Sequence, residues 1–202
     1  NSGGTFTNSD ESINGYLPNF HGGTYWHARD GGAIPKALWT SLSSGALTKV
    51  TGLSSTSLTG GFDQAFLNFE WDNSYTGQIM HGNVSIAKDF YLKSGSFSIG
   101  DNNTLTLNET VNGSSGGKLK GTTLSTLHVN TTSGSPTLDF ASGGQSLKEL
   151  KVNVTGGTSL TIPSDLNINN TLNLVSGHVV MGNNKKIILP SDASITGASD
   201  TR

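Results

Sequence analysis

The few carboxylates of this chain are the first side chains to test for catalysis. Two carboxyl groups on one strand face can act as general acid and base on a polysaccharide. Glu70 and Asp72 have this spacing, because alternate residues of a strand point to the same side. However, Asp72-Asn73 is also typical of a turn after a strand. The other neighbouring carboxylates are Asp10, Glu11 and Asp89, and the only arginines are Arg29 and Arg202. We therefore expect no enzyme, with a polysaccharide hydrolase or lyase as the weaker alternative.

Metal binding is a second candidate chemistry. Two imidazoles and a carboxylate, those of His21, His27 and Asp30, could ligate a metal ion, but their spacing matches no known motif. Oxygen atoms suited to calcium occur in Asp101-Asn102-Asn103 and in Asp72-Asn73, although Asx turns explain both. We expect neither a metal ion nor a cofactor.

The strongest binding signal is a group of aromatic residues among glycines and polar residues near the N-terminus. Aromatic faces on loops stack on sugar rings and form interaction hot spots. We therefore predict a ligand-binding surface made of Tyr16, Phe20, Tyr25, Trp26, His27 and Trp39. The favoured interpretation, however, is that these rings form the core of a cap that covers the open end of a repeat domain. One surface could serve both purposes.

The composition limits which elements can position these residues. Nearly half of the chain is Ser, Thr, Asn or Gly, only 13% is charged, and there is no cysteine. The 12 basic and 14 acidic residues supply no basic surface for nucleic acid, and the lack of cysteine excludes a disulfide scaffold. No apolar run approaches the roughly 20 residues that a membrane helix needs. A polar β-rich protein and a disordered chain remain, and the many short Val, Ile, Leu and Thr segments favour the first.

An internal repeat indicates the architecture. Leu105, Leu127, Leu150 and Leu172 follow one another at steps of 22, 23 and 22 residues. One coil of a parallel β-solenoid, with three short strands and their turns, has this length. An antiparallel sandwich also has regularly recurring strands, but it gives no reason for a constant phase. A longer echo relates residues 92–103 to residues 174–185.

We predict an all-β chain with two regions. Residues 76–202 form a right-handed parallel β-solenoid of about five coils of about 22 residues. Residues 1–75 form an aromatic-rich N-terminal cap or small β domain, because eleven of the fifteen aromatic residues precede residue 76. Alternation such as Leu172-Asn173-Leu174 places leucine inside the coil and asparagine outside.

Several segments between residues 62 and 202 share a recognisable pattern of alternating apolar residues with Gly, Ser and Asn. They are Phe66–Asn73, Gly82–Ile86, Leu92–Gly100, Gly144–Asn153 and Ala193–Arg202. This pattern resembles the low-complexity β-solenoid repeats of secreted cell-surface proteins of Bacteroidota, of the Cytophaga/Flavobacterium type. Those proteins are type IX secretion cargo and gliding or attachment adhesins. The resemblance implies a secreted, surface-attached stalk.

We therefore expect an extracellular structural and adhesive surface protein without catalytic activity, which serves as a stalk or filament segment. Its expected partners are like copies, associated end to end or laterally, or surface glycans, with no nucleic acid and no membrane insertion. The alternative is a carbohydrate-binding module of a larger polysaccharide-degrading or attachment protein. Ice binding ranks lower because no regular Thr-x-Thr ladder is present. The start Asn1-Ser2-Gly3-Gly4 shows no signal peptide, so we expect a mature product or an excised fragment.

Overall fold

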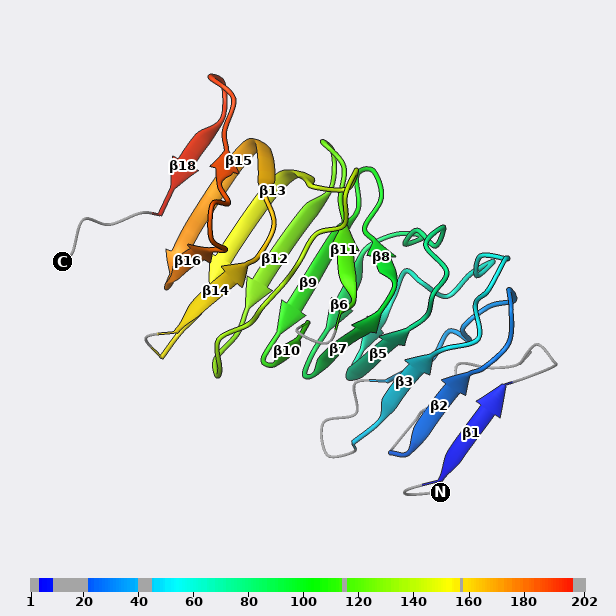
Figure 1. Cartoon of the computed structure of the whole chain (residues 1–202). Coiled ribbons are helices and arrows are strands. Elements are labelled where there is room, and N and C mark those ends of the chain that lie inside the picture. The colour runs from blue at the N-terminus through cyan, green and yellow to red at the C-terminus, as the bar shows by residue number, and fades with distance from the viewer. Residues whose placement is uncertain (1–3, 9–21, 40–44, 114–115, 157, 198–202) are drawn as a thin grey trace.

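The chain winds as a stack of parallel β-strands, which the computed structural model shows in Figure 1. The structure describes residues 4–8, 22–39, 45–113, 116–156 and 158–197. The pairings between the described strands are parallel and join residues about 22 positions apart, as in Thr104 with Thr126. The result is an all-β parallel solenoid of about eight turns. The predicted fold class and period are confirmed, whereas the right-handed sense stays a prediction.

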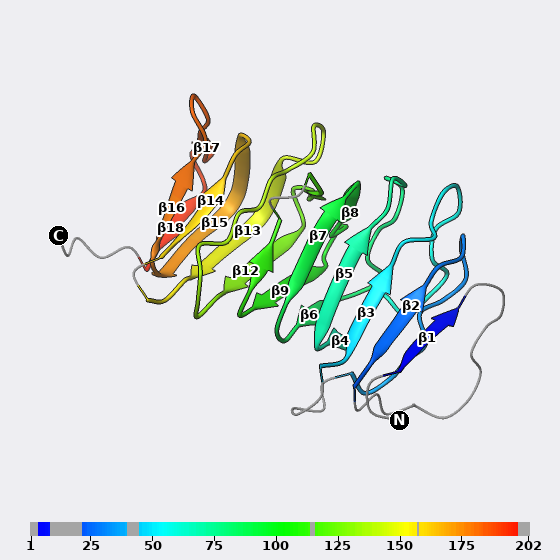
Figure 2. The same ribbon diagram turned by 60° about the horizontal axis from the view of Figure 1, so that its bottom comes forward.

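Two long sheets run along the solenoid on different faces (Figures 1 and 2). The first contains, in spatial order, β1 (Thr5–Asn8), β2 (Thr24–His27), β3 (Leu47–Val50), β5 (Asn68–Asp72), β7 (Phe90–Ser94) and β10 (Val111–Asn112). The second contains β4 (Ala65–Phe66), β6 (Val84–Ile86), β9 (Thr104–Asn108), β12 (Thr126–Asn130), β13 (Ser146–Asn153) and β15 (Leu166–Ser176), with β17 (Ile187–Ile188) and β18 (Ser194–Thr196) both paired to β15. Two short pairs complete the turns: β8 (Ser96–Ser98) with β11 (Lys118–Lys120), and β14 (Ser159–Ile162) with β16 (His178–Met181).

The solenoid has about eight turns, whereas about five coils were predicted within residues 76–202. The difference arises because residues before 76 also contribute turns. Thr24 pairs with Leu47, and Leu47 pairs with Asn68, so the step here is again close to 22 residues. The first long sheet therefore crosses residue 75 without a break. The sequence hid this period because loops separate the short strands and aromatic residues replace the leucines.

Aromatic rings fill the interior of the early turns. The ring of Phe97 makes edge contacts with those of Phe62, Phe69, Trp71 and Phe90, at centroid distances of 4.9 to 5.9 Å. Such edge-to-face pairs add to the free energy gained from burying the rings. The composition shift in the sequence thus reflects a change in what fills the solenoid.

Aliphatic side chains fill the later turns. Leu105, Leu127, Leu150 and Leu172 stand in direct register on β9, β12, β13 and β15, as the 22-residue step predicts. All four side chains are buried. Each leucine is covered by the leucines of adjacent turns, so a turn depends on its neighbours for its hydrophobic burial.

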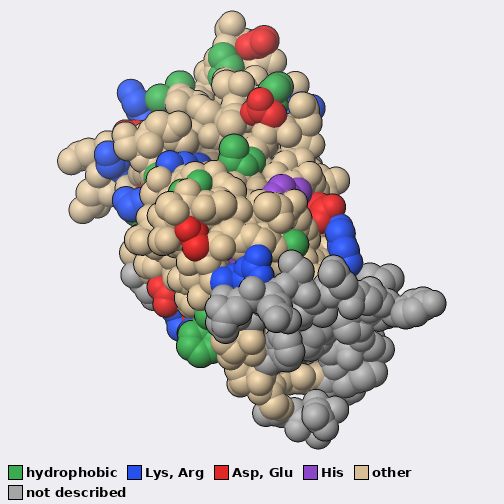
Figure 3. Space-filling view, turned by 90° about the vertical axis from the view of Figure 1, so that its right-hand side faces the viewer, with side chains coloured by type: hydrophobic (Ala, Val, Ile, Leu, Met, Phe, Trp, Pro, Cys, Tyr) green, Lys and Arg blue, Asp and Glu red, His purple; other side chains and the backbone are tan. Residues whose placement is uncertain are grey.

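Uncharged atoms make up most of the described part of the face shown in Figure 3. On the face shown in Figure 3, charged side chains of both signs are scattered among uncharged polar ones. Within the described ranges, no helix is long and apolar enough to span a bilayer.

Candidate functional site

The predicted ligand-binding residues divide between the interior and the surface. Tyr16 and Phe20 lie outside the described residues. Tyr25, His27 and Trp39 are buried, and the rings of Tyr25 and Trp39 have centroids 5.6 Å apart. These three side chains are part of the core of the first turns. Of the six residues, Trp26 is the described one that reaches the surface.

Strand alternation explains the position of Trp26. In β2, Tyr25 and His27 point inward, so Trp26 between them points outward. Its indole Nε1 donates a hydrogen bond to Thr51 Oγ1 at 2.7 Å, and the Nζ of Lys49 lies 5.4 Å from its ring centroid. A lysine at this distance makes a cation–π contact. The ring is therefore fixed in orientation and remains partly exposed.

The register of the first long sheet extends this surface over four strands. Trp26, Lys49, Glu70 and Tyr91 face outward on β2, β3, β5 and β7 as direct cross-strand neighbours. We call these four residues the Trp26 row. The row has an aromatic ring at each end and an ion pair in its middle.

Glu70 is the buried anion of this row. Its Oε1 lies 2.9 Å from the Nζ of Lys49, and its Oε2 lies 2.9 Å from the Nζ of Lys93. The contact of Oε1 with Lys49 lacks hydrogen-bond geometry, so it is an ion pair alone. The hydrogen bond to the Glu70 carboxylate raises the pKa of Lys93, and the negative charge adds to this effect.

Tyr91 ends the row as a neutral phenol. Partial burial raises the pKa of its hydroxyl, and the negative charge of Asp89 raises it further. The hydroxyl donates its hydrogen to the Asp89 carboxylate, which leaves its oxygen to accept a hydrogen bond from a ligand. The Trp26 row is therefore suited to stacking and hydrogen bonding.

The proposed catalytic pair has structural partners. Glu70 and Asp72 do face outward from the same strand, as the sequence predicts. The two lysines bind the first carboxylate, and the second accepts a hydrogen bond from Ser94 Oγ at 2.7 Å. The expectation that this chain is no enzyme stays a prediction.

The histidine and aspartate singled out for metal binding bind neighbouring groups of the protein. His27 Nε2 donates to the Gly31 carbonyl oxygen at 2.9 Å, and its Nδ1 lies 3.2 Å from the hydroxyl of Tyr25. Burial lowers the pKa of His27. His21 lies outside the described residues. Elsewhere, in the ranges that the structure describes, no three His, Cys, Asp or Glu residues gather to hold a metal ion.

Asp30 joins one turn to the next. Its carboxylate accepts hydrogen bonds from the backbone amides of Ser54, Ser55 and Thr56 at 2.8 to 3.2 Å. These donors and the hydroxyl of Ser55 hold the pKa of Asp30 far below its usual range. Asp30 therefore joins two successive loops through hydrogen bonds.

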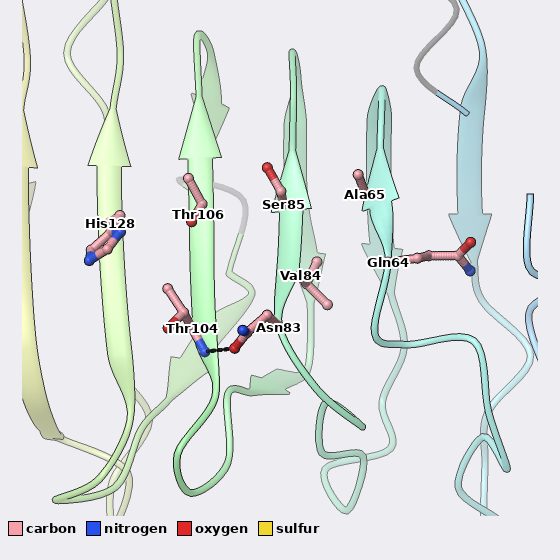
Figure 4. A pocket seen from close by; sticks show the side chains of 8 residues that line it. All are labelled: Gln64, Ala65, Asn83, Val84, Ser85, Thr104, Thr106 and His128. Carbon is pink, nitrogen blue, oxygen red and sulfur yellow. Dashed lines mark hydrogen bonds between the residues drawn. The ribbon is translucent and has the colours of Figure 1, made fainter. Parts of the chain in front are cut away.

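A second surface, which the sequence did not reveal, lies on the outer side of the second long sheet. It is a hollow of about 420 Å³ over β4, β6, β9 and β12 (Figure 4). Its lining is formed by Gln64, Ala65, Asn83, Val84, Ser85, Thr104, Thr106 and His128. We call it the polar groove. The stacking of the turns brings these residues together. The sequence feature that could have revealed the groove is the outward position of Ser85, Thr106 and His128 in consecutive turns.

The sequence matches no protein-family model and no curated protein, and the structure matches no solved structure. A function is therefore inferred from the fold and from the surface residues of the chain itself.

Proposed function

We propose that this chain is an extracellular structural and adhesive protein, a segment of a surface stalk or filament without catalytic activity. The observation that carries the proposal is the uninterrupted parallel stacking of strands around one apolar interior, from β1 at one end to β18 at the other. About eight turns, at the usual strand spacing, make a rod about 38 Å long. A stack in which each turn packs on the next resists bending and holds a surface at a fixed distance.

The apolar positions of the last described turn support contact with like copies. Ile195 pairs with the buried Leu172 and so stands at an inward-facing position, yet its side chain is 55% exposed. Val179 and Met181 are also only partly buried against the core. An uncovered apolar row beside an edge strand favours pairing with another chain. A second solenoid placed end to end would cover it.

Sedimentation velocity and electron microscopy test this association. We expect particles longer than one rod to form as the protein concentration rises, and Ile195→Lys to shift the population towards single rods. Leu124→Lys is the matched control, since Leu124 is also exposed but lies away from this end. Single rods at every concentration would contradict end-to-end association.

The surface location rests on the resemblance of residues 62–202 to secreted surface repeats of Bacteroidota. In the organism that encodes this chain, protease treatment of intact cells should remove it. A protected, intracellular pool after such treatment would count against a surface stalk.

A carbohydrate-binding module is the second candidate, and the position of Trp26 favours it. Of the three tryptophans, Trp39 and Trp71 are buried, whereas Trp26 presents part of its ring outward. Exposed indole faces stack on sugar rings. Loss of glycan binding in Trp26→Ala, with the circular dichroism spectrum unchanged, would support this candidate. Release of reducing sugars that Glu70→Gln abolishes would instead indicate an enzyme.

A further inference from the structure

The polar groove follows the axis of the solenoid. Its lining comes from four consecutive strands of one sheet, so it extends over three strand spacings, or about 14 Å. Its volume of about 420 Å³ lies within the usual range of small-molecule sites. Ala65, Ser85 and Thr106 lie side by side on adjacent strands of its lining (Figure 4), and the side chains of Ala65 and Ser85 are short.

Hydrogen bonds fix the walls of the groove. Gln64 uses its whole amide group: Oε1 accepts from Ala37 N and Trp39 Nε1, and Nε2 donates to the carbonyl oxygens of Pro35 and Gly61. Gln64 is therefore a rigid wall and has no hydrogen-bonding capacity left for a ligand.

Two further side chains at the groove have polar partners. Asn83 Oδ1 accepts from Thr104 N at 2.8 Å, which leaves the amide nitrogen of Asn83 as a donor. At the other end, Nε2 of His128 lies 3.5 Å from the Glu149 carboxylate of the next strand. The Asn83 side chain is thus positioned before a ligand arrives, which lowers the entropic cost of binding.

The hydroxyls inside the groove are available. Within the part of the chain that the structure describes, no side-chain hydrogen bond uses the hydroxyl of Ser85, Thr104 or Thr106. Each of these hydroxyls can donate one hydrogen bond and accept others. Sugar hydroxyls have the same dual capacity, so the two sets are complementary.

The charge of the lining selects among ligand classes. None of the eight lining residues is Lys, Arg, Asp or Glu. An anionic ligand would need a basic partner, and a divalent cation would need carboxylates. The apolar side chains of the lining are those of Ala65 and Val84 and its one ring is the imidazole of His128, which is little surface for binding an apolar molecule. A neutral, hydroxyl-rich chain remains.

We propose that the polar groove binds a neutral polysaccharide, with the sugar chain lying along the solenoid axis across β6, β9 and β12. The inference rests on the adhesive part of the proposed function and names the chemistry of the adhesive contact. Binding to one groove is weak, because the hollow is shallow and offers no stacking platform. Many copies on one surface convert such weak binding into firm attachment through avidity.

The test is an NMR titration of the full-length chain with cellohexaose, a neutral and extended oligosaccharide. We expect amide shifts confined to the groove, at Ser85, Thr104, Thr106 and His128. Thr104→Val with Thr106→Val removes two hydroxyls while keeping β-branched side chains, and should weaken binding at least tenfold. Thr137→Val with Thr161→Val is the matched control, because these two threonines are also paired on adjacent turns but lie away from the groove. Its affinity should equal that of the unmodified chain.

Several results would overturn the inference. They are the absence of shifts with cellohexaose, shifts scattered over the surface, an unchanged affinity in the double variant, and loss of binding in Trp26→Ala instead. Binding of an oligogalacturonate in preference to cellohexaose would also reject a neutral ligand. End-to-end association is measured in a separate experiment. If the rods do not associate, the proposed stalk function is contradicted; if cellohexaose does not bind, only the proposed role of the polar groove is contradicted.

Discussion

Lys49 and Glu70 face each other on neighbouring strands, with 2.9 Å between Nζ and Oε1. Lys93, from the following turn, lies 2.9 Å from the other carboxylate oxygen. The side chain of Glu70 is 8% exposed, whereas those of Lys49 and Lys93 are 28% and 43% exposed. One buried acid thus joins three successive turns.

This arrangement predicts a strongly non-additive response to loss of the two lysines. Lys49→Met or Lys93→Met alone leaves Glu70 with one cation, so each should cost about 1 kcal/mol or less. The double variant leaves a buried carboxylate without a counter-charge and should cost about 3–5 kcal/mol. Urea unfolding of the four proteins gives the coupling free energy, and additive losses would contradict this account.

The same cluster predicts a milder effect for Glu70→Gln. This variant leaves two lysines whose side chains already reach water, so neither charge is trapped in the interior. The loss of stability should therefore be smaller than in the double lysine variant, by at least about 1 kcal/mol. A loss as large as that of the double variant would show that the lysines, and not the carboxylate, bear the burial cost.

The corner glycines predict a second contrast. Gly95 and Gly143 both have positive φ angles, of 67° and 76°. A Cβ on Gly95 would overlap the carbonyl oxygen of Asn73 in the turn beneath, whereas a Cβ on Gly143 meets no atom within 4 Å. Gly143→Ala should cost about 1–2 kcal/mol from backbone strain, and Gly95→Ala about 1–3 kcal/mol more from the clash. Equal shifts of the two urea midpoints would argue against this close stacking.

Buried His27 predicts a pH dependence. Its pKa is lowered in the folded state, chiefly by burial and also by the charge of Arg29, whereas the unfolded chain has the ordinary value of about 6.5. Below this pH the unfolded chain binds more protons, so the stability due to neutral His27 is complete above it and is lost as the pH falls. The slope should reach at most about 1.4 kcal/mol per pH unit.

His27→Gln isolates this contribution, because glutamine can still donate to Gly31 but does not titrate. Urea midpoints of both proteins between pH 8 and pH 5 should converge as the pH falls. A constant difference over this range would mean that His27 has the same protonation state in the folded and unfolded chains.

The register of the later turns was predictable because leucine recurs there at a fixed step. Leu105, Leu127, Leu150 and Leu172 are all core residues in direct register. A similar spacing elsewhere has a different meaning: Leu124 lies 23 residues before the buried Leu147 but is exposed. Spacing alone does not distinguish an apolar residue on a strand from one in a turn.

The echo between residues 92–103 and 174–185 has a local cause. In both segments a glycine of positive φ, Gly95 or Gly177, separates two strands. The corner at Gly95 follows β7 of the first long sheet and leads to β8. The corner at Gly177 follows β15 of the second long sheet and leads to β16. The repeated residues therefore encode a type of corner and not a position in the coil. The polar groove escaped prediction for a related reason, because its shape depends on which side chains the stacking places side by side.

A leucine series along the solenoid tests whether stability is local to neighbouring turns. Leu127, Leu150 and Leu172 occupy equivalent inward positions, but Leu172 pairs with the poorly covered Ile195 on its outer side. Truncation to alanine should cost about 3–5 kcal/mol at Leu127 and Leu150, where a cavity forms between complete turns. At Leu172 the loss should be nearer to about 2 kcal/mol and confined to the C-terminal turn. Hydrogen exchange distinguishes the two cases: Leu172→Ala should accelerate exchange in β15 to β18 and leave β9 and β12 protected. Equal acceleration in all turns would mean that the solenoid unfolds as one cooperative unit, so the end would be as well anchored as the middle.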